Sequence, residues 1–155
     1  MTESRQPPMA VILSVAGLIP FLVCGWGAMS RDPSGVQINS LALITYGAVS
    51  LSFLGGVHWG FVLKGDAQPG ERRRLALGVL PALTGWGAAL LGITTHMVLG
   101  LAVLIAGYIA TAVLEGRGHR LELVPHGYMM LRWLLTGVIV LMLAAVLVQR
   151  VGLMF

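Results

Sequence analysis

The stretch "LALGVLPALTGWGAALLGITTHMVLGLAVLIAGYIATAVL", residues 75–114, contains no Asp, Glu, Lys or Arg. A membrane-spanning helix needs about 20 predominantly apolar residues, so this stretch is long enough for two of them. Thr94, Thr95 and His96 interrupt the aliphatic run near its middle and predict a hairpin turn. We therefore expect helices near 75–93 and 97–114.

Three further uncharged stretches lie outside this segment, at residues 6–30, 33–63 and 133–149. They predict helices near 8–29, 40–63 and 131–149, and their continuous apolar runs lack the alternation that barrel strands need. The whole chain is 57% hydrophobic and only 10% charged, against roughly 25% charged residues in globular domains. The sequence thus predicts an all-α polytopic membrane protein, with residues 1–155 forming one domain of five transmembrane helices.

The ten basic residues are distributed unevenly between the connecting segments. Five spans put the N-terminus and the segments 64–74 and 115–130 on one side, together with all basic residues except Arg31 and Arg150. By the positive-inside rule, the N-terminus is cytoplasmic and the C-terminus is outside, as in a multi-pass protein of the bacterial inner membrane. Basic residues beside the spans set the orientation in the membrane and bind anionic lipid headgroups, which accounts for the excess of positive charge. We therefore expect the lipid bilayer, and no nucleic acid, as a partner of this protein.

Small residues and prolines predict how the spans pack and bend. Ser52, Gly56 and Gly60 recur every four residues, which predicts a groove where a neighbouring helix approaches closely. Pro20 and Pro81 each remove a helix hydrogen bond and are expected to kink their helices.

His58 is an ionisable residue inside the second expected span. An unpaired polar side chain in lipid is costly, so His58 is expected to face the bundle interior and to have a partner. It lies about 9 Å from Lys64 along the helix axis, at 1.5 Å per residue. Partners at this depth would come from the start of the last span and the segment before it: His119, Glu122, His126, Tyr128 and Arg132.

Several roles for His58 remain open at this point. A bis-histidine haem would pair His58 with His119 or His126. The simpler role is a hydrogen bond from His58 to a helix carbonyl or hydroxyl that fixes packing. Arg132, for its part, has the alternative of extending its side chain to the membrane interface, as arginines at helix ends commonly do.

Three blocks of the sequence resemble a known family. They are "AGLIPF" (16–21), "YGAVSLSFLGGVHWG" (46–60) and the pattern P-x-x-Y-x-x-L-R-x-x-L-T at 125–136. In these blocks the chain resembles the domain of unknown function 3429 family, the transmembrane protein 69-like integral membrane proteins. The resemblance implies a small polytopic membrane protein and supplies neither an activity nor a cofactor.

The last two blocks both fall at the expected cytoplasmic end, which suggests that they meet there. The expected result is a polar pocket suited to a quinone head, a phospholipid or a haem, and formed by His58, Trp59, His126, Tyr128 and Arg132.

Enzyme chemistry has little support in the sequence. Motifs for metalloproteases, redox dithiols, phosphate loops and serine hydrolases are absent, and all six acidic residues lie outside the expected spans. No catalytic or metal-binding residue is therefore assigned. Two interpretations remain: an accessory or assembly subunit that packs against a larger inner-membrane complex or a second copy of itself, and a ligand-binding protein that uses the pocket around His58 and Arg132.

Overall fold

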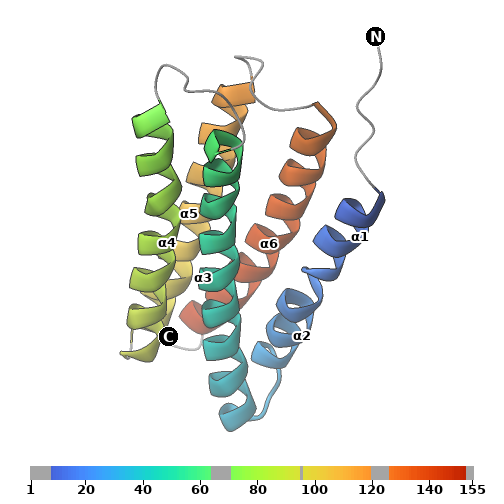
Figure 1. The fold of residues 1–155 in the computed structure, drawn as a ribbon. Coiled ribbons are helices and arrows are strands. Elements are labelled where there is room, and N and C mark those ends of the chain that lie inside the picture. The colour runs from blue at the N-terminus through green and yellow to red at the C-terminus, as the bar shows by residue number, and fades with distance from the viewer. Residues whose placement is uncertain (1–7, 64–70, 95, 120–125, 153–155) are drawn as a thin grey trace.

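The structure is a computed structural model that describes residues 8–63, 71–94, 96–119 and 126–152. The described residues form six helices and no strand: α1 Pro8–Ala16, α2 Ile19–Ala28, α3 Pro33–Leu63, α4 Glu71–Ile93, α5 Met97–His119 and α6 His126–Gly152. The predicted all-α class is confirmed for this part of the chain (Figure 1).

Four helical segments are long and apolar enough to cross a membrane. They are Pro8–Ala28, Pro33–Val57, Met97–Gly116 and Met130–Gly152. The remaining expected span corresponds to a shorter apolar helix, Gly78–Ile93 within α4.

The helices form an elongated bundle. α3 packs against α2, α4 and α5, while α6 packs against α5 and α2; α4 covers the outside of α3 and α5. Figure 1 shows the end of α3, the start of α4, the end of α5 and the start of α6 together at one end. We call this the first end, and the second end is where α2, α4 and α6 finish and where α3 and α5 begin.

The predicted hairpin turn lies between α4 and α5. Thr94 Oγ1 donates a hydrogen bond to the Leu90 carbonyl at 2.9 Å, and the His96 N–H donates to the Leu91 carbonyl at 3.1 Å. These bonds satisfy carbonyls that the end of α4 would otherwise leave unpaired. Thr95 lies outside the described residues.

The helices α3 to α6 extend beyond their expected bounds, and the start of α3 shows why. It begins at Pro33, so the expected start near residue 40 was wrong. Asp32 Oδ2 accepts hydrogen bonds from the Gly35 N–H at 2.7 Å and the Ser34 hydroxyl at 2.9 Å, and Pro33 occupies the first helical position. Asp followed by Pro is a helix-start signal that a search for apolar length overlooks.

The first expected span, 8–29, is interrupted rather than continuous. α1 ends at Ala16 and α2 begins at Ile19, directly before Pro20, which has no N–H to donate to the carbonyl of the preceding turn. The Tyr46 hydroxyl of α3 donates a hydrogen bond of 3.0 Å to the Gly17 carbonyl at this break. α4, in contrast, continues through Pro81.

The core lies between α2, α3, α5 and α6. Aromatic rings fill its centre: Phe21 packs edge-on against Tyr46 and Tyr108, with ring centroids 5.0 and 6.2 Å apart. The buried Tyr108 hydroxyl donates a 2.9 Å hydrogen bond to the Gly47 carbonyl, so it is satisfied without water. Aliphatic side chains complete the core: Leu43, Ile44, Leu51, Leu101, Leu104, Leu143 and Val146.

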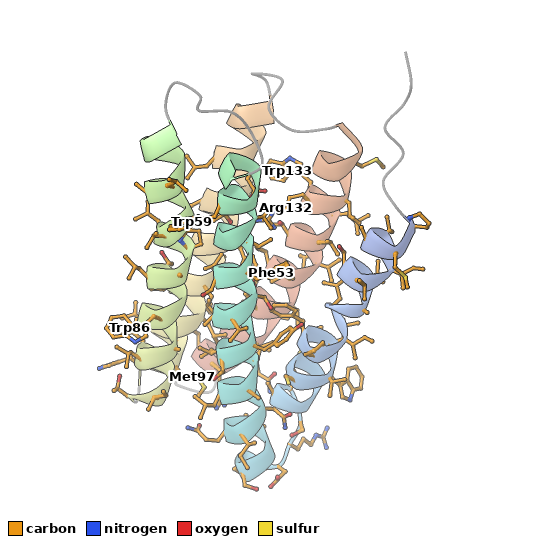
Figure 2. The ribbon with its side chains drawn as sticks, in the orientation of Figure 1. Phe53, Trp59, Trp86, Met97, Arg132 and Trp133 are labelled. Carbon is orange, nitrogen blue, oxygen red and sulfur yellow. The ribbon has the colours of Figure 1, made fainter. Side chains whose placement is uncertain are left out.

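Exposed tryptophans mark both ends of the bundle. Trp59 and Trp133 lie toward the first end and Trp86 toward the second (Figure 2). Trp26, in the last turn of α2, also belongs to the second end and is 78% exposed. Tryptophan side chains prefer the membrane interface, so these positions favour an interface near each end of the bundle.

Glycines bring α3 and α4 into close contact. A Cβ added at Gly55 would meet the Gly78 carbonyl oxygen, and one at Gly85 would lie 2.7 Å from the Ala48 carbonyl oxygen. Among the described residues, nothing lies within 4 Å of a Cβ added at Gly56 or Gly60. Within the described chain, α3 therefore makes its close contact with α4 at Gly55, which lies one residue and about 100° around the helix from Gly56. A close contact at Ser52, Gly56 and Gly60 stays a prediction.

We predict that Gly85→Ala destabilises the protein by about 1 to 3 kcal/mol, because the added methyl group would press on the backbone of α3. Gly56→Ala is the matched control on open surface and is expected to be neutral. Thermal unfolding in detergent measures both; equal effects from the two variants would contradict the packing described here.

We also predict that the Asp32 cap makes stability depend on acidic pH. The Gly35 N–H, followed by the Ser34 hydroxyl, holds the pKa of Asp32 below its ordinary value. The cap's contribution is thus fully present above that ordinary pKa, about 3.9, and is lost as pH falls through the lower folded-state pKa.

An NMR titration of the Asp32 carboxyl in micelles should give a pKa below the ordinary value. Asp32→Asn keeps a capping side chain that does not titrate, so its melting temperature should lack this acid dependence. Identical acid dependence in the two proteins would rule out this role.

Candidate functional site

Arg132 lies inside the bundle with three partners. Its side chain is 3% exposed, and Nε donates a 2.7 Å hydrogen bond to Glu115 Oε2 in a buried salt bridge. Nη1 donates to Thr136 Oγ1 at 2.7 Å, and Nη2 donates to Thr111 Oγ1 at 3.2 Å. We call Thr111, Glu115, Arg132 and Thr136 the α5–α6 polar cluster.

Helix periodicity brings these four residues together. Thr111 and Glu115 are one turn apart on α5, as are Arg132 and Thr136 on α6, so each pair lies on a single helix face. Thr111 donates its own hydroxyl proton to the Gly107 and Tyr108 carbonyls at 3.0 and 2.9 Å. Its oxygen therefore remains an acceptor for Arg132.

The position of Glu115 corrects one prediction from the sequence. Glu115 is 5% exposed and belongs to the span Met97–Gly116, so the expectation that every acidic residue lies outside the spans was wrong. The fourth expected helix ended at residue 114, whereas α5 continues to His119. Apolar length alone ends the helix before the first charged residue, whereas here that residue is a buried part of the helix.

The contacts of Arg132 differ from those of an arginine that reaches the membrane interface. The guanidinium of Arg132 does not extend to the interface, because Nε, Nη1 and Nη2 each donate to a side chain of α5 or α6. Its part in a ligand pocket stays a prediction. A missed signal exists in the sequence: Thr111 and Glu115 have the same four-residue spacing as Arg132 and Thr136.

Trp59 contacts α4 rather than α6. Its Nε1 donates a 3.1 Å hydrogen bond to the Leu75 carbonyl, and its ring lies against Gly78. Trp59 and Arg132 lie toward the same end of the bundle in Figure 2, but their polar groups bind different helices.

The remaining members of the expected pocket are not described at the side-chain level. His58 lies in α3, and His126 and Tyr128 lie in α6, but their side chains are outside the described part of the structure. The same holds for the side chain of His119, and Glu122 lies outside the described residues altogether. A meeting of His58 with Arg132 stays a prediction.

The chemistry of the α5–α6 polar cluster is that of a satisfied charge pair. A buried charge is tolerated when an opposite charge is close and its polar atoms are hydrogen-bonded; at Arg132 each of the three guanidinium nitrogens donates one hydrogen bond. Charge-assisted bonds of this kind are shorter and stronger than neutral ones and have strict geometry. The cluster therefore fixes how α5 and α6 lie against each other.

Comparison with known proteins places the chain in a family. The model for "Protein of unknown function (DUF3429)" matches residues 6–148, which is most of the sequence. The chain belongs to the DUF3429 family. No solved structure matches it significantly.

Two curated relatives of this DUF3429 chain are both called Transmembrane protein 69. The protein from Mus musculus is 37% identical over 87 residues, covering 55% of this chain and 35% of the relative. The protein from Xenopus tropicalis is 38% identical over 88 residues, covering 54% of this chain and 33% of the relative. The chain thus spans about a third of the length of these relatives, and with its apolar helices it is a multi-pass membrane protein.

We predict that removing one member of the buried pair is worse than removing both. Arg132→Met or Glu115→Leu alone should lower the free energy of unfolding by about 3 to 5 kcal/mol, because each removes the oppositely charged group that lies against the other buried charge. The double variant should lose clearly less than the sum of the two.

A double-mutant cycle of unfolding in detergent or bicelles measures this coupling. Val113→Ala is a control on an exposed position of α5 and should have little effect. A loss of stability in the double variant equal to the sum of the losses in the two single variants would show that Arg132 and Glu115 do not stabilise each other.

Proposed function

We propose that this protein is a non-catalytic accessory or assembly subunit of a larger complex in the bacterial inner membrane. The observation that carries the proposal is the outward side of α3, where Gly56 and Gly60 are exposed and open. We call Val49, Ser52, Phe53, Gly56 and Gly60 the outer face of α3.

The outer face of α3 has the composition of a helix-docking surface. Its members are three or four residues apart and therefore share one side of the helix. Small residues let a second backbone approach closely, and Val49 and Phe53, at 61% and 73% exposed, supply apolar contact beside them. The contact at Gly55 and Gly78 is the same kind of packing within this chain.

The α5–α6 polar cluster supports a non-catalytic role. Its two opposite charges lie in direct contact, and its threonine hydroxyls each accept one hydrogen bond from Nη1 or Nη2 of Arg132. Such a cluster stabilises the bundle without presenting a reactive group to a substrate.

The proposed orientation has a cytoplasmic N-terminus. It rests on the distribution of the ten basic residues. Eight of them lie near the N-terminus or in and beside the two segments that connect α3 to α4 and α5 to α6. The helix ends that flank both connecting segments lie at the first end of the bundle, and the start of α1 points toward the same end (Figure 1).

A ligand pocket for quinone, phospholipid or haem around His58 and Arg132 is the competing function. The donors of Arg132 and Trp59 are directed to partners within the chain, which favours the accessory role. The competing function is therefore treated as one outcome of the following test.

We predict that Gly56→Leu combined with Gly60→Leu removes a partner protein that otherwise remains bound on gentle extraction. Leucine side chains would separate the helices that the glycines let approach. Gly137→Leu is the matched control, because Gly137 is also exposed and open but lies on α6.

Native mass spectrometry of protein extracted from its own membrane gives the readout. A partner at fixed stoichiometry, lost in the double variant and kept in the control, supports the proposal; a second copy of this chain would identify a homo-oligomer. A bare subunit carrying a quinone, haem or lipid that His58→Leu removes would replace the proposal with the pocket.

A further inference from the structure

We infer that Arg150, at the second end of the bundle, binds the phosphate of a membrane phospholipid. This site is separate from the α5–α6 polar cluster, and the inference does not depend on the proposed function. Arg150 lies in the last turn of α6, within the span Met130–Gly152.

The guanidinium of Arg150 is held in place by α3. Nη2 donates hydrogen bonds to the Val36 carbonyl at 3.0 Å and to Ser40 Oγ at 2.8 Å. Ser40 is fully buried, and its own hydroxyl donates to the Val36 carbonyl at 2.7 Å. Both hydrogens of Nη2 are thus used, and the orientation of the planar group is fixed.

The charge of Arg150 lacks a carboxylate partner among the described residues. In the described part of the chain, the salt bridge joins Arg132 to Glu115 and does not involve Arg150. The Asp32 carboxylate accepts hydrogen bonds from Ser34 and Gly35 at the start of α3. Nε of Arg150 is buried without a hydrogen-bond partner, and Nη1, which is not buried, has none within the described chain either. Two Nη1 hydrogens are therefore available to a group outside the protein.

The surroundings favour a lipid phosphate as that group. Trp26 and Trp86 mark the interface at this end, so Arg150 lies at the depth where headgroups begin. Ile38 and Val148, near Ser40 and Arg150 in sequence, are 68% and 67% exposed and offer apolar surface for acyl chains. An unneutralised arginine here is costly, and the phosphates of the bilayer are the abundant anions at this depth.

The test compares Arg150→Gln with Arg31→Gln in nanodiscs of phosphatidylglycerol. Arg31 is an exposed arginine at the same end, so its substitution changes net charge equally without touching the site. Native mass spectrometry after release from the nanodisc counts retained lipids. We expect one lipid on the wild type and on Arg31→Gln, and at least about tenfold lower occupancy on Arg150→Gln, since one or two charge-assisted hydrogen bonds are lost.

Two further arms keep the inference falsifiable if Arg150→Gln fails to fold. Ser40→Ala removes one acceptor of Nη2 and should lower lipid occupancy while leaving the arginine in place. Arg150→Lys keeps the positive charge and should show more bound lipid than Arg150→Gln. Equal lipid occupancy in wild type and Ser40→Ala or Arg150→Gln would overturn the inference, as would equal loss in Arg31→Gln. An adduct with the mass of inorganic phosphate, formed when that ion is added, would overturn the lipid assignment.

Discussion

An arginine in the apolar interior of a helix bundle must have its charge neutralised and its donors satisfied. Arg132 is 3% exposed, and its requirements are met by Glu115 and two threonines on the facing surfaces of α5 and α6. Because these bonds need correct distance and orientation, they select one register between the two helices. The ion pair is thereby the most demanding contact among the described residues.

The rest of the bundle follows from less specific contacts. Glycines at 55, 78 and 85 allow α4 to lie directly on α3, and aromatic rings at 21, 46 and 108 fill the space between α2, α3 and α5. The hydroxyls of Tyr46, Tyr108 and Thr111 donate to helix carbonyls, so these hydroxyl donors are satisfied in the absence of water. The exposed surface is largely apolar, as expected of a protein surrounded by lipid.

Much of the architecture could be predicted from the sequence, because apolar length and charge position directly reflect the thickness of a bilayer. The helical class, the hairpin turn near Thr94 and the division of the chain into apolar segments all follow from that rule. Helix ends were harder, since the cap at Asp32 and the helical continuation through Glu115 depend on local hydrogen bonds rather than on hydropathy.

The candidate site was harder still. Gly55, Gly56 and Gly60 all suit close packing, and only the tertiary arrangement shows that Gly55 faces α4. The partner of Arg132 could not be predicted from apolar length, because that rule ends the fourth span at residue 114 and leaves Glu115 outside the membrane. The sequence signal for this pair is that Thr111 and Glu115, like Arg132 and Thr136, are four residues apart and so share one helix face.

The central claim is that Arg132 and Glu115 form a direct ion pair within the membrane-embedded bundle. Solid-state NMR of the protein in bilayers, with ¹⁵N in arginine side chains and ¹³C in glutamate carboxyls, measures this contact through the nitrogen–carbon dipolar coupling. The account predicts a strong coupling, consistent with the 2.7 Å separation of Nε and Oε2, that disappears in Arg132→Lys. A spectrum without that coupling, or one in which it persists in Arg132→Lys, would contradict the account.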